Sequence, residues 1–150
     1  MIVKMEPAHL MLVMLNARKE EFERWQIGPD PQRWVCSTAL KAGIAFTVLN
    51  EQGHPVACFG FLDEVGTSAT IWMLCTNEWK RWIKQMRKTV DAVINGGVYT
   101  RVQAMIDPLN APAVKFIRWL GFEKDGTVRK GAPDGSDFDL YSIVRAECQT

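Results

Sequence analysis

The sequence predicts one α/β (α+β) domain, in which a mixed, mostly antiparallel sheet of about six to seven strands is flanked by about four helices. Three observations lead to this. The chain has 150 residues, the usual length of one domain and enough to bury a core without staples. Apolar residues alternate along residues 44–75 and then follow a helical period along residues 79–94. No repeat or linker divides residues 1–150, so we expect a single domain.

Composition excludes several classes of protein. The 18 Lys and Arg residues nearly balance the 17 Asp and Glu residues, which argues against a broad basic surface for nucleic acid or an anionic membrane. Leu10–Leu15, the longest early apolar run, is too short to span a bilayer, and no targeting segment is visible. His9 and His54 lie far apart, and the cysteines show no metal-ligand spacing, so we expect no metal and free thiols in a reducing, cytoplasmic compartment. The cysteines are Cys36, Cys58, Cys75 and Cys148.

The first elements are marked by proline and glycine. Ile2–Met5 is a short apolar segment that predicts a first strand. Glu6-Pro7 then opens a helix, since proline is tolerated in the first turn. Asp30-Pro31 repeats this signal, and Gly43 is expected to close the second helix in a left-handed conformation.

The middle of the chain predicts three neighbouring strands. Ile44–Leu49 alternates in the manner of a strand, and residues 51–55 are typical of a turn. Two further apolar runs, Val56–Leu62 and Ala69–Cys75, follow with short connections. Such connections favour an antiparallel meander.

The period then changes to that of an amphipathic helix. Its lysines and arginines lie largely off the apolar stripe, and Gly96-Gly97 ends the helix. The stripe consists of Trp79, Trp82, Ile83, Met86, Val90, Val93 and Ile94.

The last third begins with a strand at residues 102–106. Asn110 is expected to cap a short helix that Gly121 closes, and Trp119 and Phe122 are predicted to lie in the core. Residues 124–136 are rich in glycine and charge, which indicates an exposed hairpin or loop with room for a further strand. Residues 138–144 predict the last strand. The predicted order is β-α-α-β-β-β-α-β-α-β.

One segment carries a family resemblance. Residues 107–122 resemble the N-x-x-A-x-x-(apolar)-(Tyr)-x-x-x-G-F motif of the GNAT N-acetyltransferases, and the element order agrees over nearly the whole chain. Residues 71–76, the basic-aromatic helix and this motif together are similar to small GNAT-like proteins of tailed bacteriophages, including an internal virion protein of podovirus type. The matching motif residues are Asn110, Ala113, Phe116, Gly121 and Phe122.

The resemblance implies acetyl-CoA as cofactor and an amine as acceptor. The cofactor would lie along the fourth strand where this strand splays from the fifth, its pyrophosphate would meet the turn after the fourth strand, and Asn110 would face the pantetheine. Asn110 has an alternative role as a helix cap alone. The cofactor-binding residues implied in this way are Met73, Leu74, Cys75, Thr76, Lys80, Arg81 and Asn110.

The sequence departs from the family at the phosphate turn. Residues 76–82 contain no glycine, although glycine lets a backbone approach phosphate closely, and Glu78 adds negative charge. Lys80 and Arg81 are therefore interpreted either as phosphate ligands or as a solvated helix face.

A second departure concerns catalysis. Ile117 stands where many relatives have a tyrosine that protonates the departing thiolate. Glu64, with Asp63 beside it, and Tyr141 are weak catalytic candidates. The alternative is that Glu64 and Asp63 are solvated carboxylates of a turn and that Tyr141 is a half-buried residue of a strand. A backbone N–H of the fourth strand is expected to supply electrostatic stabilisation.

Two hypotheses of function follow. The first is an acetyl-CoA-dependent N-acyltransferase with an unidentified amine acceptor. The alternative is a catalytically silent GNAT-fold phage protein, located in host cytoplasm or virion, that binds a virion or host partner, with Trp79 or Trp82 as exposed anchors. The oligomeric state stays open, a homodimer included, and nucleic acid is not an expected partner.

Overall fold

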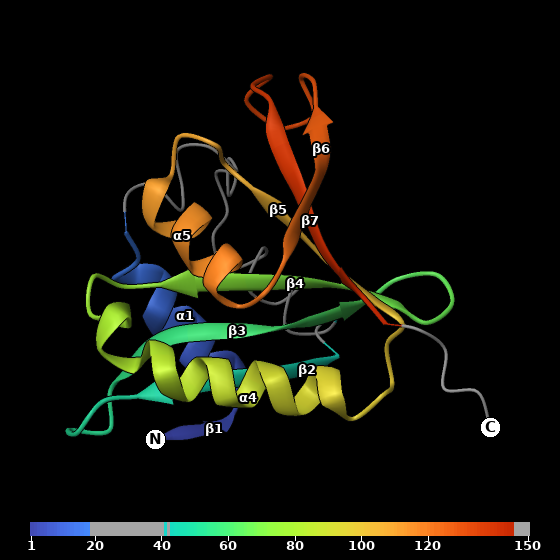
Figure 1. The fold of residues 1–150 in the computed structure, drawn as a ribbon. Helices are drawn as coiled ribbons and strands as arrows, with labels where there is room; N and C mark the ends of the chain where they lie inside the picture. Colours follow the sequence, from blue (N-terminus) through green and yellow to red (C-terminus); the bar gives the residue numbers. More distant parts are fainter. Residues whose placement is uncertain (19–40, 42, 146–150) are drawn as a thin grey trace.

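The structure is a computed structural model that describes residues 1–18, 41 and 43–145 (Figure 1). Its strands form one sheet of seven in the order β1-β2-β3-β4-β5-β7-β6, in which β4 and β5 are parallel and all other neighbours antiparallel. The strands are β1 (Ile2–Lys4), β2 (Ile44–Leu49), β3 (Pro55–Asp63), β4 (Ser68–Cys75), β5 (Arg101–Ile106), β6 (Glu123–Val128) and β7 (Phe138–Val144). The helical elements are α1 (Pro7–Leu15), the 3-10 turn η1 (Trp79–Trp82), α4 (Ile83–Asn95) and α5 (Ala111–Trp119).

The predicted mixed sheet is therefore confirmed. The described residues form three α-helices, fewer than the four expected, and the second predicted helix lies almost entirely outside them. Gly43 does not have the left-handed conformation that we expected of it. Instead it lies close to strand β3, where an added Cβ would be 3.1 Å from the carbonyl oxygen of Phe61.

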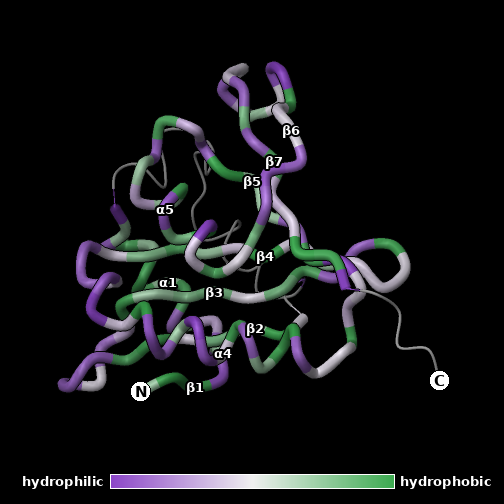
Figure 2. The backbone as a smooth tube through the Cα atoms, in the orientation of Figure 1, coloured by the Kyte–Doolittle hydropathy of each residue, from purple (hydrophilic) through white to green (hydrophobic). Residues whose placement is uncertain are grey.

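Helices cover the sheet on both faces, α4 and α5 on one and α1 on the other (Figure 1). The main core lies under α4 and includes Phe59, Phe61, Met86 and Val90. A second core lies under α1. The strands β3 and β4 between the two cores are largely hydrophobic, whereas α4 alternates between hydrophilic and hydrophobic along its length (Figure 2). A strand buried on both faces has this composition, because both sets of its side chains meet apolar neighbours.

The residues predicted to begin or end helices do so in the helices α1 and α5. Glu6 and His9 form a reciprocal capping box at the start of α1, directly before Pro7. The side chain of Asn110 accepts a hydrogen bond from the backbone N–H of Ala113 at 3.4 Å, and Gly121 closes α5 with a φ of 94°.

Two predictions from the second half of the chain need correction, and a third is confirmed. The predicted long helix begins as a 3-10 turn at Trp79, and the α-helix starts at Ile83. The hairpin or further strand expected within residues 124–136 is present, since β6 pairs there with β7 along an edge of the sheet. Trp119 is not in the core, because 39% of it is exposed, whereas Phe122 is buried as predicted.

Candidate functional site

The candidate site is the gap that opens where β4 and β5 separate. Their parallel ladder consists of three pairs only, and the last one joins Thr70 to Gln103. Beyond this pair the two strands diverge, and the gap widens toward their carboxyl ends (Figure 1). The predicted splay of the fourth strand from the fifth is thus present. It leaves one edge of β4 without a strand partner over its second half.

A cavity of about 130 Å³ occupies this splay. From the α4 side it is lined by Met73, Met86 and Val90, together with the inner face of α5. From the opposite side it is lined by Trp72 and Met105. Because side chains alternate between the faces of a sheet, a cavity lined from both faces passes through the sheet between the two strands.

The backbone direction of β4 determines which polar groups face the cavity. The N–H of Thr76 donates to the carbonyl of Val56 on β3, at 2.9 Å. Ladder groups alternate along an antiparallel strand, so residues at even spacing from Thr76 face β3, and the N–H of Met73, beyond the last β4–β5 pair, faces the splay. The carbonyl of Cys75, on the same edge, accepts from the N–H of Arg18 rather than from β3. The splay thus has a backbone donor on its β4 edge.

The turn after β4 uses three of its N–H groups in local hydrogen bonds. The N–H of Glu78 donates to the hydroxyl of Thr76, the N–H of Trp79 to the carbonyl of Thr76, and the N–H of Arg81 to the carbonyl of Glu78. Donors that are used within a turn cannot converge on an anion. The turn therefore does not fit a pyrophosphate, in agreement with its lack of glycine.

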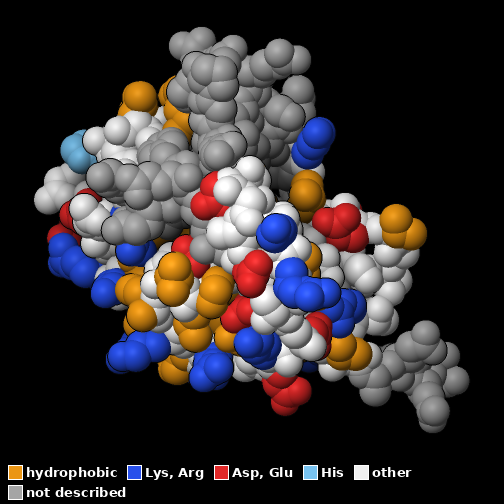
Figure 3. All heavy atoms as spheres, turned by 90° about the horizontal axis from the view of Figure 1, so that it is seen from above, with side chains coloured by type: hydrophobic (Ala, Val, Ile, Leu, Met, Phe, Trp, Pro, Cys, Tyr) orange, Lys and Arg blue, Asp and Glu red, His pale blue; other side chains and the backbone are white. Residues whose placement is uncertain are grey.

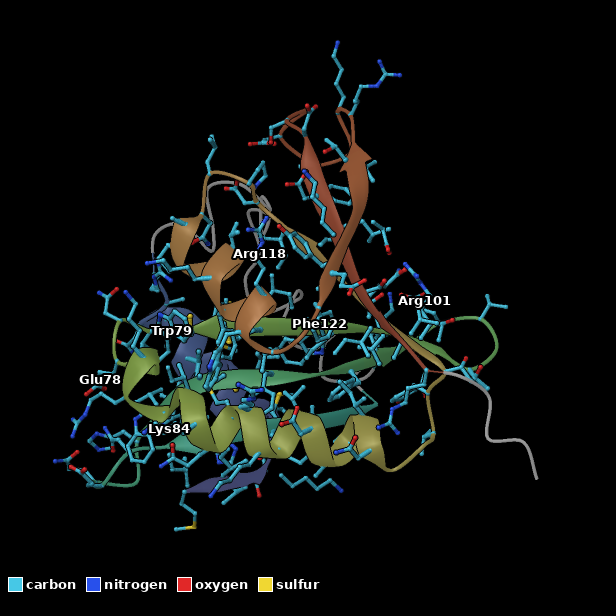
Figure 4. All side chains as sticks on the ribbon, viewed as in Figure 1. Glu78, Trp79, Lys84, Arg101, Arg118 and Phe122 are labelled. Atoms are coloured by element: carbon cyan, nitrogen blue, oxygen red, sulfur yellow. The ribbon has the colours of Figure 1, made fainter. Side chains whose placement is uncertain are left out.

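The predicted basic ligands lie outside the cavity. Lys80 and Arg81 are exposed, and the guanidinium of Arg81 forms an ion pair with Glu51 at 3.3 Å. Glu78 and Lys84 extend outward at the left of Figure 4, and Trp79 lies on the inner side of the turn.

The structure divides the predicted cofactor residues into two groups. Met73 and Asn110 line the cavity. Leu74 belongs to the core under α1 and Cys75 to the main core. Thr76 is buried, and its hydroxyl donates to the carbonyl of Val56. The side chains of the second group do not reach the splay.

The catalytic candidates lie around the closed end of the splay. Glu64 accepts a hydrogen bond from the hydroxyl of Thr70 at 2.9 Å, directly beside the last ladder pair. Asp63 accepts from the Tyr99 hydroxyl at 2.5 Å, so its carboxylate already has a structural partner. Tyr141 is 1% exposed and pairs with Ala104, which lines the cavity. Ile117 lines the cavity but carries no proton to donate.

A row of aromatic rings extends from η1 to α5 through Phe116, which lines the cavity. The ring centroids of Trp79 and Phe116 are 5.3 Å apart, and those of Phe116 and Trp119 are 6.1 Å apart. The guanidinium of Arg87 lies 4.5 Å from the ring centroid of Trp119. Trp79 and Trp82 therefore pack inward and are not exposed anchors, which corrects that part of the interaction hypothesis.

Sequence reasoning missed Trp72. It lies on β4 within the run Ile71–Cys75, which could be taken only as buried strand, and it lines the cavity from the α1 side. A strand with large side chains on both faces, followed by a helix, is the signal that could have indicated a lining residue on each face.

Two kinds of site are absent from the described residues. No group of three or more His, Cys, Asp or Glu residues in this part of the chain could hold a metal ion. Among the described helices, none combines the length and the apolar character needed to cross a membrane.

Comparison with known proteins shows likeness at the level of fold. No family sequence model matches the chain, and no curated protein is similar to it in sequence. The ribosomal-protein-S5-alanine acetyltransferase of Vibrio fischeri has a TM-score of 0.76 at 14% identity, over 99% of this chain and 94% of that one. A GNAT-family acetyltransferase of Bacillus anthracis has a TM-score of 0.74 at 16% identity, over 95% and 93%.

A third structure was solved with a ligand. The aminoglycoside acetyltransferase AAC(6')-Ib in complex with coenzyme A has a TM-score of 0.69 at 20% identity, over 96% of this chain and 94% of that one. The likeness to phage virion proteins stays a prediction. The seven-stranded sheet, the splayed β4 and β5 and these superpositions together establish that the chain has the GNAT acetyltransferase fold over nearly its whole length.

Proposed function

We propose that this protein transfers an acetyl group from acetyl-CoA to an amine in the splay between β4 and β5. The observation that supports this is the end of the β4–β5 ladder at Thr70 and Gln103, which leaves the N–H of Met73 directed toward a partly open, mainly apolar cavity. Acetyl-CoA supplies an activated acetyl thioester. In the overall exchange the amine forms a C–N bond to the acetyl carbon, the C–S bond breaks, and the proton that the amine loses balances the departing thiolate as the free thiol of coenzyme A.

The residues around the splay would bind and orient the reactants. The N–H of Met73 can donate to a carbonyl oxygen in the cavity, and Asn110 offers its amide at the opposite wall. The apolar side chains of Met86, Val90 and Ile117 exclude water, which strengthens these polar contacts. Orientation alone can supply several kcal/mol toward amine attack on a thioester.

The diphosphate end of the cofactor has no comparable site. Because the N–H groups of the turn are used locally, Lys80 and Arg81 would have to act as exposed cations. Exposed ion pairs contribute only about 0–1 kcal/mol each. Most binding free energy would therefore come from the acetyl-pantetheine part.

Glu64 is the candidate that we propose for proton removal, with Thr70 holding its carboxylate beside the closed end of the splay. Tyr141 stays a weaker candidate as proton donor, because the core encloses it. Glu64→Gln should lower kcat about a hundredfold or more if Glu64 is the general base. It should leave the affinity for acetyl-CoA unchanged.

The test of cofactor binding is thermal unfolding with acetyl-CoA, S-acetylpantetheine or adenosine 3′,5′-bisphosphate. At about a hundred times Kd a ligand adds about 2.7 kcal/mol of stability, which raises Tm by about 5–11 °C for a chain of this length. We expect the first two ligands to stabilise the protein and the bisphosphate to have little effect. Absence of a shift at millimolar acetyl-CoA and S-acetylpantetheine would exclude the proposal.

A second candidate function is the silent GNAT-fold protein with a virion or host partner, and Trp119 is the observation that favours it. This tryptophan is 39% exposed, and the guanidinium of Arg87 on α4 lies 4.5 Å from its ring centroid. Figure 3 shows hydrophobic side chains with Lys and Arg side chains around them on one face of the molecule. Exposed tryptophan beside arginine is typical of binding hot spots. The Lys and Arg residues of η1 and α4, which we call the basic helix face, are Lys80, Arg81, Lys84, Arg87 and Lys88.

The two candidates predict different effects of Trp119→Ser. An interaction protein should lose its partner, measured by co-purification of the phage or host complex, whereas acetyl-CoA binding should be unchanged. A variant that still recovers the partner would exclude Trp119 as the anchor.

A further inference from the structure

The last pair of the β4–β5 ladder is joined through its side chains. The amide nitrogen of Gln103 on β5 donates to the hydroxyl of Thr70 on β4 at 3.2 Å. The next residues along the two strands are Ile71 and Ala104, which line the cavity and have no polar side-chain atom. The side chains of the two strands therefore change from hydrogen-bonded to apolar at the point where the strands part.

This contact has a fixed direction because it belongs to a chain of hydrogen bonds. The side-chain oxygen of Gln103 accepts from the guanidinium of Arg101 at 3.4 Å, so the amide nitrogen is the atom that faces Thr70. The hydroxyl of Thr70 in turn donates to Glu64 at 2.9 Å. Arg101 itself donates to Asp125 at 2.7 Å. The chain thus runs from a paired cation on β5 to a carboxylate beside β4, and each donor in it meets an acceptor.

The opposite end of the ladder has a similar contact, which provides an internal comparison. The hydroxyls of Thr67 and Thr100 are 2.6 Å apart, and the N–H of Thr100 donates to the carbonyl of Thr67 at 2.9 Å. These residues precede the first ladder pair, which joins Ser68 to Arg101. The contact between the two threonines therefore links the starts of the same two strands, away from the point where they part.

The end of so short a ladder needs support. The β4–β5 ladder has only three pairs, parallel pairing is slightly less stable per residue than antiparallel pairing, and the ends of elements open most readily. If the pair of Thr70 and Gln103 opened, the splay would begin earlier along both strands. Residues 104–107, which form the wall of the cavity after this pair, would then no longer be held at a fixed distance from the N–H of Met73.

We propose that Gln103 is a positioning residue of the cofactor site, and that its hydrogen bond to Thr70 fixes the point where β4 and β5 part. By fixing this point, Gln103 sets the width of the splay between the N–H of Met73 and residues 104–107. Gln103 acts through the two strands and not by contact with the cofactor. Its role in the cofactor site rests on the proposed function, whereas its effect on the strands does not.

The test uses variants that remove parts of this chain of hydrogen bonds. Gln103→Met removes the polar group at similar length, whereas Gln103→Glu keeps an oxygen for Arg101 but has no N–H for Thr70 at neutral pH. Thr67→Val is the matched control, because it removes the hydroxyl contact at the other end of the ladder. Amide hydrogen exchange is followed by ¹H–¹⁵N NMR in the protein without ligand, and urea denaturation reports whether each variant folds and how stable it is.

We expect the amides that join the last ladder pair to exchange about threefold to tenfold faster in both Gln103 variants, beyond any change in global stability, as one lost hydrogen bond predicts. Thr67→Val should speed exchange at Thr100 and leave the last pair unchanged. The Kd of S-acetylpantetheine, measured by calorimetric titration, should rise by a similar factor in the Gln103 variants and stay constant in Thr67→Val. Thr70→Ser, which keeps the hydroxyl, should exchange at the wild-type rate.

Unchanged exchange at the last pair in Gln103→Met, or faster exchange there in Gln103→Met but not in Gln103→Glu, would overturn the proposal, because the bond to Thr70 would then not hold the strands. Faster exchange with an unchanged Kd of S-acetylpantetheine would refute the positioning role and leave the transferase in place. Failure of the proposed function is distinguishable from both results. In that case no form of the protein would bind S-acetylpantetheine, while exchange in the Gln103 variants would still report on the point where the strands part.

Discussion

Among single residues, Asn110 is notable because it both caps α5 and lines the cavity. Substitutions at this position can separate the two roles. Asn110→Ala should lower the free energy of unfolding by about 1 kcal/mol, the usual cost of a lost N-cap. Asn110→Asp is the matched control, since aspartate caps a helix about as well. Urea denaturation measures both variants.

The same pair of variants tests cofactor binding by Asn110. Aspartate has no N–H donor and adds charge at the cavity. We therefore expect Asn110→Asp to keep the stability of the protein but to lose most of the acetyl-CoA-induced shift in Tm. If acetyl-CoA raised the Tm of this variant as much as that of the wild type, Asn110 would act only as a helix cap.

Tyr99 gives a prediction about pH. Burial, and then its hydrogen bond to Asp63, raise the pKa of the Tyr99 phenol to about 12. The folded protein thus holds this proton at a pH where the unfolded chain, with a pKa near 10.0, has lost it. The stability that Tyr99 contributes is complete below about pH 10 and falls as the pH rises toward about 12.

The comparison with Tyr99→Phe isolates this effect from other groups that titrate at high pH. The difference in unfolding free energy between wild type and variant should be constant from about pH 7 to about pH 9.5 and should shrink above that range. Chemical denaturation at each pH measures it. A difference that does not change up to about pH 11.5 would contradict the assigned pKa.

The identity of a residue predicted its conformation well where that conformation depends on local chemistry alone. Asn110 and Gly121 are such cases, because a cap and a left-handed turn depend on local chemistry. Trp119 and Gly43 were wrongly predicted, because exposure and close approach depend on neighbours that are distant in sequence. Trp119 is exposed, but its ring packs against Phe116 and the guanidinium of Arg87.

At the scale of elements, the turn between β4 and α4 determines how a diphosphate could bind. Glu78 places a carboxylate at this turn, beside the exposed Lys80 and Arg81. Glu78→Gln should tighten acetyl-CoA binding by about 0.2–1 kcal/mol, up to about fivefold, because it removes the repulsion of phosphate. Calorimetric titration measures the change.

Glu123→Gln is the control for that variant, since Glu123 is also an exposed carboxylate, on β6. It removes the same charge far from the turn along the chain and should leave the affinity unchanged. Equal gains from both variants would attribute the effect to net charge and not to the turn.

Periodicity predicted most elements but not their finer form. The spacing of Trp79 and Trp82 fits a 3-10 turn as well as an α-helix, so the pattern could not distinguish the two. Strand β6 was expected only as a further strand within an exposed hairpin or loop, because five of its six residues are exposed and several are charged. Charged residues protect the edge of a sheet, and such a strand has little apolar signal to detect.

At the scale of the whole molecule, the candidate site arises from topology. The parallel pairing of β4 with β5, the antiparallel insertion of β7 and the packing of α5 together open the splay. The family resemblance led us to expect this splay, but composition and periodicity alone did not. The cavity through the sheet, with Trp72 on one side and Met86 on the other, depends on contacts between elements far apart in sequence.

Charge distribution gives the last prediction. The chain has a net charge of +1, yet η1 and α4 carry the five cations of the basic helix face and one acid, Asp91. If acetyl-CoA binds with its phosphates against exposed side chains and not in a backbone cradle, salt must screen much of that attraction. The Debye length falls from about 30 Å at 0.01 M salt to about 3 Å at 1 M.

We therefore expect the Kd of acetyl-CoA to rise several-fold between about 0.01 M and about 0.5 M salt. The Kd of S-acetylpantetheine, which has no phosphate, should stay constant and serves as the matched control. At high salt the two ligands should bind almost equally, because only the contacts in the splay remain. An acetyl-CoA affinity independent of salt would require phosphate held by buried backbone donors, and the local hydrogen bonds of Glu78, Trp79 and Arg81 would then have to open on binding.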